Sequence, residues 1–129
     1  MLQQKNGFKM IIDANIILRC LLQDNYELAE KAKSFIDNND CFAPTEVIAE
    51  VVFVLLKVYN VPRTEIAELI TVLFEYYEVQ NEQLLKKTLE YFGATTLDFV
   101  DCLLAAYHSV ENEEIATLDK KLVNFINRL

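Results

Sequence analysis

Four acidic residues are the strongest candidates for chemistry, because each lies beside or within an apolar segment: Asp13, Glu50, Asp101 and Asp119. Carboxylate oxygens are hard ligands that suit Mg²⁺ or Mn²⁺. His108 is the only histidine, which argues against a histidine-ligated zinc site or a Ser-His-Asp triad. The sequence has no glycine-rich phosphate loop, which argues against a nucleotide cofactor. Hard oxygen ligands for a divalent metal therefore remain as the favoured chemistry.

Asp13 and Asp119 occupy similar places in the pattern of elements. Each follows a short apolar segment that reads as a strand, at residues 8–12 and 115–118. Ligands bind beyond the carboxyl ends of strands in open parallel sheets, so both positions favour a binding role. Each aspartate also begins a predicted helix, and aspartate is a preferred N-cap. Capping alone is therefore the alternative for both.

Asp101 and Glu50 are expected to lie within mostly apolar helices. An acid that faces a packed interior is costly unless it is paired or bound to a metal. For Asp101 the alternative is a capping pair, with Asp98 as the N-cap and Asp101 as the third helical residue. For Glu50 the alternative is a solvated stripe shared with Glu46 and Lys57.

Short apolar segments alternate with longer amphipathic helices along the chain. Strands are predicted at residues 8–12, 41–43, 77–79 and 115–118, and helices at 15–22, 26–36, 44–59, 64–76, 82–92, 99–110 and 120–128. Thr64 and Asn81 are predicted helix caps, and Gly93 is predicted to end its helix in the left-handed conformation. The alternation predicts an α/β fold with a parallel sheet covered on both faces. Residues 1–7 are predicted to be a loose extension, and 8–129 a single domain.

Composition narrows the class of protein. The 129 residues are 53% hydrophobic and carry a formal net charge of −8. Such a charge argues against a sequence-reading DNA-binding module and suits a basic protein partner. Three cysteines without C-x-x-C spacing indicate reduced thiols, and we expect a cytoplasmic protein. No apolar run reaches membrane-spanning length, so no membrane association is expected.

Four motifs together resemble the PIN-domain ribonucleases, particularly the toxins of type II (virulence-associated) toxin–antitoxin pairs. Residues 11–19 read IIDANIILR and resemble the opening of that family. Residues 47–55 read VIAEVVFVL, residues 97–106 LDFVDCLLAA and residues 116–121 ATLDKK, each similar to a family motif that carries an acid. The resemblance spans about residues 8–125, in the family's order and spacing.

The resemblance implies a three-layer α/β/α fold with a short central parallel sheet of four to five strands. It also implies a metal-dependent ribonuclease in which Asp13, Asp101 and Asp119 bind Mg²⁺ or Mn²⁺ and Glu50 acts through water. Asn15 and Thr117 would be polar supports for the ligands. The candidates for contacts with RNA phosphates are Arg19, Lys120 and Lys121, for which ordinary surface charge is the alternative.

The resemblance further implies a homodimer, with the helices at 44–60 and 64–76 as its surface, and a small antitoxin that brings basic residues to the acids. Two other functions remain open. The first is a non-catalytic scaffold with the same fold. The second is a receiver-type domain phosphorylated on aspartate, although no suitable phosphoacceptor or late lysine is apparent in the sequence.

Overall fold

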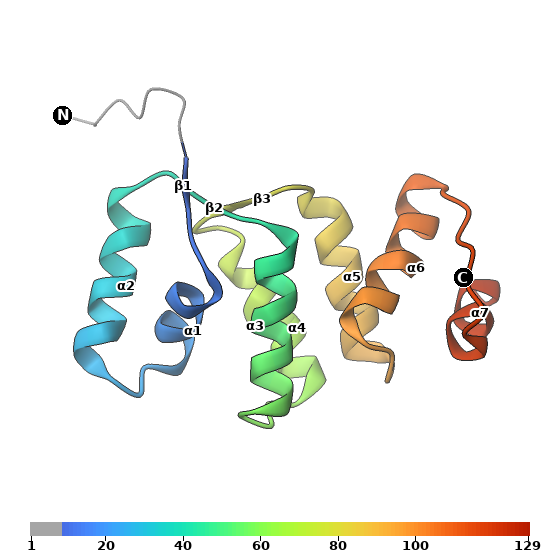
Figure 1. Ribbon diagram of the computed structural model, residues 1–129, viewed down its shortest axis with the longest axis horizontal. Coiled ribbons are helices and arrows are strands. Elements are labelled where there is room, and N and C mark those ends of the chain that lie inside the picture. The colour runs from blue at the N-terminus through green and yellow to red at the C-terminus, as the bar shows by residue number, and fades with distance from the viewer. Residues whose placement is uncertain (1–8) are drawn as a thin grey trace. The chain divides into compact units, whose positions relative to one another are not determined.

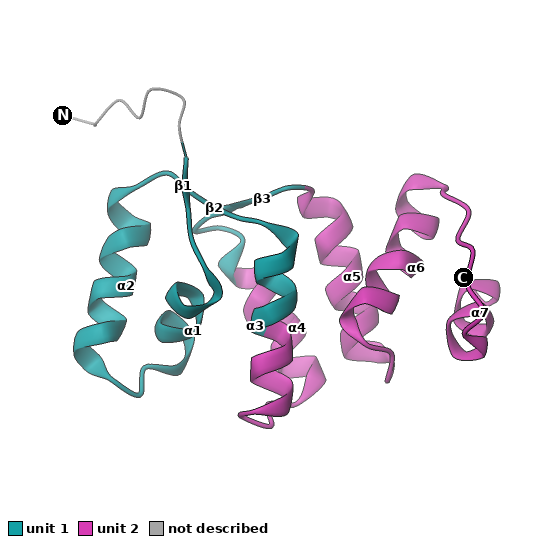
Figure 2. Ribbon diagram, viewed as in Figure 1, with its two compact units in different colours: residues 1–51, 73–80 teal, residues 52–72, 81–129 magenta. Residues whose placement is uncertain are grey.

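The computed structural model describes residues 9–129, so the extension predicted at residues 1–7 and the first strand residue, Phe8, lie outside the described part. The chain forms two compact units (Figure 2). Unit 1 holds residues up to Val51 together with Leu73–Gln80, and unit 2 holds Val52–Val72 and Asn81–Leu129. Within the described residues no helix is long and apolar enough to cross a membrane.

Unit 1 contains a small parallel sheet (Figure 1). Its strands are β1 (Met10–Ile11), β2 (Cys41–Ala43) and β3 (Glu78–Val79), in the order β1-β2-β3. Met10 is paired with Cys41 and Phe42 with Glu78. Beyond β1, the Ile12 amide donates to the Phe42 carbonyl at 3.0 Å, so the chain stays beside β2 up to the residue before Asp13.

The helices of unit 1 begin at side chains or carbonyls that accept from their first free amides. These helices are α1 (Ala14–Leu22), α2 (Tyr26–Asn38) and the first part of α3 (Thr45–Lys57). Asn25 caps α2 by accepting from the Leu28 amide at 3.0 Å. The Pro44 carbonyl accepts from the amides of Val47 and Ile48 and so starts α3. The buried apolar residues of the unit are Ile12, Ala14, Ile17, Ala29, Ala32, Cys41, Ala43, Ile48, Val51, Phe74 and Tyr77.

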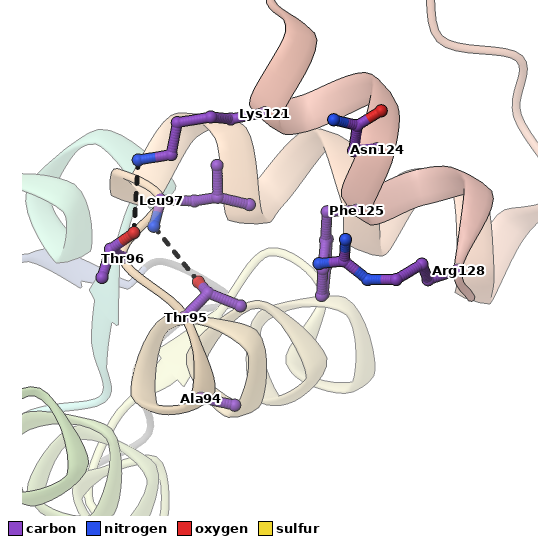
Figure 3. A pocket seen from close by; sticks show the side chains of 8 residues that line it. All are labelled: Ala94, Thr95, Thr96, Leu97, Lys121, Asn124, Phe125 and Arg128. Atoms are coloured by element: carbon purple, nitrogen blue, oxygen red, sulfur yellow. Dashed lines mark hydrogen bonds between the residues drawn. The ribbon is translucent and has the colours of Figure 1, made fainter.

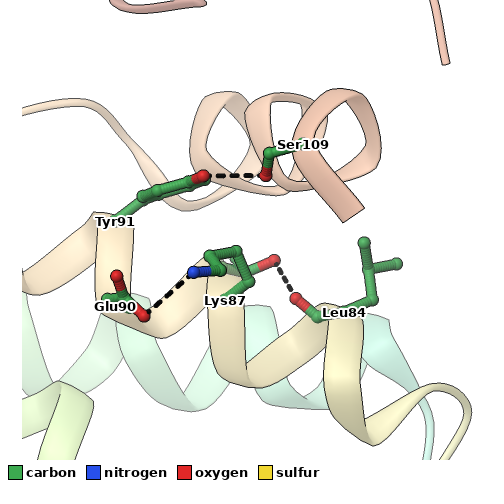
Figure 4. Close-up of polar contacts among 6 residues, drawn as sticks. Leu84, Lys87, Glu90, Tyr91 and Ser109 are labelled. Atoms are coloured by element: carbon green, nitrogen blue, oxygen red, sulfur yellow. Dashed lines mark hydrogen bonds and ion pairs between the residues drawn. The ribbon is translucent and has the colours of Figure 1, made fainter. Parts of the chain in front are cut away.

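Unit 2 is helical throughout its regular elements. It contains the end of α3, most of α4 (Arg63–Leu73), and all of α5 (Glu82–Ala94), α6 (Phe99–Glu111) and α7 (Lys120–Asn127). The Tyr91 hydroxyl on α5 donates to the Ser109 hydroxyl on α6 at 2.7 Å, which joins the two helices (Figure 4). Its buried residues are Val52, Leu55, Ile66, Ile70, Leu84, Leu85, Thr88, Leu89, Tyr91, Phe92, Leu97, Phe99, Cys102, Ala105, Ala106 and Leu122.

The α/β class is confirmed, but the prediction of four to five strands is wrong, because the described sheet has three. The missing strand is the one predicted at residues 115–118, which lie in an irregular connection between α6 and α7. Leu118 is 100% exposed. A strand requires a hydrogen-bonded neighbour, and an apolar segment cannot supply one by itself.

Two local predictions are also wrong. Thr64 does not cap a helix, because α4 already begins at Arg63 and the Pro62 carbonyl accepts from the Ile66 amide at 3.0 Å. Gly93 does not end α5, which continues to Ala94. A Cβ atom at Gly93 would lie 3.3 Å from the Ala67 Cβ on α4. The glycine therefore permits close packing of α5 against α4.

Candidate active site

Asp13 lies at the carboxyl end of β1 and begins α1. Its Oδ1 accepts from the Ile16 amide at 3.1 Å, so the carboxylate is the N-cap of α1. The side chain is exposed. The partial positive charge of a helix N-terminus stabilises a carboxylate in this position. Asp13 thus has both the sheet-edge position and the capping role that the sequence suggested.

A groove of about 200 Å³ runs beside Asp13 in unit 1. Its lining residues come from Asp13 and the two helices that follow: Asp13, Asn15, Ile16, Arg19, Leu28, Lys31, Ala32 and Phe35. Arg19 is ion-paired with Asp24 at 3.2 Å, so its charge is already partly compensated. Asn15 and Arg19 therefore share one groove with Asp13, while the direction of Arg19 is set by Asp24.

Glu50 lies on the exposed side of α3. The buried side of this helix carries Ile48, Val51 and Leu55. Glu46 and Lys57 are exposed as well. Glu50 therefore lies on a solvent-exposed stripe of α3 with Glu46 and Lys57, which is the alternative stated for it above, and its carboxylate is not buried.

Asp98 and Asp101 form the predicted capping pair at the start of α6. Asp98 Oδ1 accepts from the Asp101 amide at 2.8 Å. Asp101 is half-buried, and this partial burial is the main reason why its pKa is raised above 3.8. The negative charges of Asp98 and then Asp119 raise the pKa further, whereas Lys121 lowers it.

Asp119 is held at the start of α7. Its amide donates to the Thr117 hydroxyl at 3.0 Å, and its Oδ1 accepts from the amides of Lys121 at 2.9 Å and Leu122 at 3.3 Å. Thr117 thus contacts the backbone of Asp119, and its role as a polar support for a metal ligand stays a prediction. Lys120 is exposed. The contacts of this segment bring the charge of Asp119 within reach of Asp101.

The four candidate acids are divided between the units. Asp13 and Glu50 belong to unit 1, and Asp101 and Asp119 belong to unit 2. Among residues 9–129, no three Asp, Glu, His or Cys side chains are grouped closely enough to hold a metal ion. The donor chemistry nevertheless fits Mg²⁺. The carboxylate oxygens of Asp98, Asp101 and Asp119 are hard ligands, and the pKa of Asp101 is raised by its partial burial and then by the charges of Asp98 and Asp119, which a divalent cation would offset.

A second pocket was not anticipated from the sequence. It has a volume of about 400 Å³ and lies beside α7 in unit 2 (Figure 3). Lys121, Asn124, Phe125 and Arg128 contribute one of its walls. Lys121 was already a candidate for phosphate contact. Asn124, Phe125 and Arg128 were missed, although their spacing of three, four and seven residues from Lys121 places them on the same helix face.

The PIN domain family matches residues 10–126 of the chain. The match covers most of the sequence and includes all four candidate acids. No curated protein and no solved structure matches the chain.

Proposed function

The chain belongs to the PIN-domain family, and on that basis we propose that it is a Mg²⁺- or Mn²⁺-dependent ribonuclease that hydrolyses RNA phosphodiester bonds. PIN domains are generally nucleases, so the family supports a hydrolase. The observation that carries the proposal is the position of Asp101, a half-buried carboxylate with two further acids, Asp98 and Asp119, near it. Its pKa is raised first by partial burial and then by the charges of those acids, and a cation is favoured at such a place.

Each acid has a role in this proposal. Asp13, Asp101 and Asp119 would be the metal ligands, and Glu50 would orient a water molecule. When bound, the metal ion lowers the pKa of a coordinated water and offsets negative charge on the attacked phosphate. Thr117 fixes the backbone of Asp119, and the two helix N-termini fix the carboxylates of Asp13 and Asp119.

Cleavage of a labelled single-stranded or looped RNA by the purified protein tests the proposal. We expect cleavage with Mg²⁺ or Mn²⁺ and none with EDTA. Asp101→Asn should lower the rate about 100-fold or more, because a metal ligand contributes several kcal/mol and each 1.4 kcal/mol is tenfold. Glu65→Gln is the matched control, since Glu65 is an exposed acid at the third residue of α4 in the same unit.

The variants also separate the rival functions. The metal site would be contradicted if cleavage persists in EDTA. It would also be contradicted if Asp101→Asn cleaves RNA at the same rate as Glu65→Gln. A protein that binds RNA but never cleaves it with either metal would be a scaffold. Circular dichroism that matches the parent excludes unfolding as the reason for lost activity.

We also propose that the ribonuclease is the cytoplasmic toxin of a toxin–antitoxin pair, with a basic antitoxin as its partner. The net charge of −8 and the acids near Asp101 in unit 2 support a partner that supplies Arg or Lys. Induced expression in a bacterial host should arrest growth, and expression of Asp101→Asn should not. Equal growth with the two proteins would contradict the toxin role.

A homodimer is proposed as the assembled form. Three large apolar side chains of unit 2 on or beside α3 and α4 are open to solvent: Phe53 at 59%, Val58 at 61% and Val72 at 56%. Contact with a second copy would bury them. Light scattering at tens of micromolar should give about twice 14.9 kDa. A species of 14.9 kDa alone would contradict the dimer.

A further inference from the structure

The pocket beside α7 has two walls, both in unit 2 (Figure 3). One wall is the end of α5 and the connection that leads to α6, at residues 94–97. The other is made by Lys121, Asn124 and Phe125 on one face of α7 and by its C-cap, Arg128. Its volume of about 400 Å³ is within the range of small-molecule sites.

The charge of this pocket is opposite to that of the chain. Its lining includes the cations Lys121 and Arg128 and no carboxylate, although the protein has a net charge of −8. Lys121 Nζ donates to the Thr96 hydroxyl at 3.2 Å, which holds the ammonium group across the pocket (Figure 3). A cationic pocket with a hydroxyl group and an amide suits an anion such as a phosphate group.

The aromatic ring of the pocket is fixed in place. Phe125 packs edge-on against Tyr91, with ring centroids 5.0 Å apart and planes at 83°. The Arg128 guanidinium lies 5.9 Å from the centre of the Phe125 ring. Phe125 is half-buried and lies beside two cations. Proteins bind single-stranded nucleic acid with this pair of features, because a base stacks on the aromatic ring and the phosphates contact the positive charges.

The pocket adjoins the acids of unit 2 along the chain and in space. Leu97 on one wall precedes Asp98, and Lys121 on the other follows Asp119 by two residues. Arg63 fixes the first wall, because its guanidinium donates to the carbonyls of Phe92 at 2.9 Å and of Leu97. Lys121 also acts electrostatically on Asp101. A strand bound in the pocket would therefore lie near the acids of unit 2.

We propose that this pocket binds one nucleotide of a single-stranded RNA substrate, with a phosphate at Lys121 and Arg128 and the base against Phe125. The choice of RNA as the ligand rests on the proposed function. The pocket would hold the strand beside the acids, and Asn124 would donate or accept at the base edge.

Fluorescence anisotropy of a short labelled single-stranded RNA, measured in EDTA so that metal-dependent cleavage cannot occur, tests the pocket. Arg128→Gln and Asn124→Asp change exposed residues, and the second adds a carboxylate with almost no change in shape. Each should raise Kd about fivefold or more. Lys57→Gln is the matched control, because Lys57 is an exposed cation of unit 2 that does not line the pocket.

Salt dependence separates the two kinds of contact. Arg128→Gln should reduce the slope of log Kd against log salt by about 0.7, the value for one lost phosphate contact on a single strand. Phe125→Leu should weaken binding with little change in that slope, because stacking does not release counterions. Thermal melting verifies that each variant is folded.

The outcomes distinguish this inference from the nuclease proposal. Kd values for Arg128→Gln and Asn124→Asp equal to that of Lys57→Gln would overturn the pocket, even if the wild type cleaves RNA with Mg²⁺. Wild-type protein that does not bind the RNA would overturn it too. Weaker binding by both pocket variants supports the pocket, and a parallel lack of cleavage with either metal would then count against the nuclease alone.

Discussion

Replacing Asp101 by asparagine tests the charge cluster of unit 2 without knowledge of the RNA. The carboxylate loses its repulsion from Asp98 and Asp119, while its backbone amide still donates to Asp98. Like charges three residues apart on a helix cost about 0.2–0.5 kcal/mol. Asp119 adds a similar, solvent-screened amount, so the relief is about 0.5–1 kcal/mol.

The substitution also removes an acid from the first turn of α6, which costs about 0.3–1 kcal/mol of favourable interaction with the helix dipole. Glu65→Gln removes an acid from the same helical position of α4 and therefore measures that cost. The difference between the variants reports the relief of the partial burial of Asp101 together with the relief of the like-charge cluster, and only the second part is screened by salt. At this chain length about 0.5–1 kcal/mol corresponds to roughly 2–5 °C, so Asp101→Asn should melt that much above Glu65→Gln in EDTA at pH 7 and low salt.

Salt, pH and metal each change this difference in a known direction. One molar salt should shrink it, because the Debye length falls to about 3 Å. The pKa of Asp101 is raised in the folded state, so its ionised carboxylate destabilises the fold at pH values above that pKa. This destabilisation is lost as the pH falls through the folded-state pKa toward 3.8. Millimolar Mg²⁺ should raise the melting temperature of the wild type more than that of Asp101→Asn. Equal melting temperatures for the two variants at low salt and pH 7 would refute the like-charge cluster.

Three further expectations concern packing and burial. The Tyr77 hydroxyl is buried without a hydrogen-bond partner among the described residues. Tyr77→Phe should therefore raise the free energy of unfolding by about 1 kcal/mol. A lower free energy of unfolding in urea denaturation would contradict this. Gly93→Val should lower the free energy of unfolding by about 1–3 kcal/mol, because its Cβ would lie 3.3 Å from the Ala67 Cβ. An unchanged melting temperature would show that α4 can shift to make room for the new side chain. Burial raises the pKa of Cys102 to about 11, whereas Cys20 is half-exposed, so iodoacetamide should modify Cys20 at least about tenfold faster in the native protein, as peptide mass spectrometry can measure.

The features that the sequence predicted correctly depend on neighbouring residues. Asn81 and Asp98 cap α5 and α6 because a short polar side chain can reach an amide three residues ahead. Nothing distant has to be known for such a prediction. The helices at residues 82–92 and 99–110 were therefore placed within two residues of their observed ends.

The features that the sequence predicted wrongly depend on distant partners. The segment at 115–118 has the apolar residues of a strand, but its secondary structure is decided by whether another strand lies beside it. Gly93 suits both a helix end and a close helix contact, and only the position of Ala67 distinguishes them. The convergence of the candidate acids is a long-range property of the same kind, and it stays a prediction.

In the proposed site, fold and activity would depend on different atoms of the same carboxylates. The hydrogen bonds that cap α1 and α7 fall on Oδ1 of Asp13 and Asp119, so a cation would be bound through Oδ2 of each side chain. Asparagine or serine could replace either cap at little cost in stability. If these positions carry the proposed activity, a copy of this gene that lost it there would still fold, so selection for stability alone would not eliminate that copy. Inactive descendants with an intact structure are therefore an expected product of this architecture.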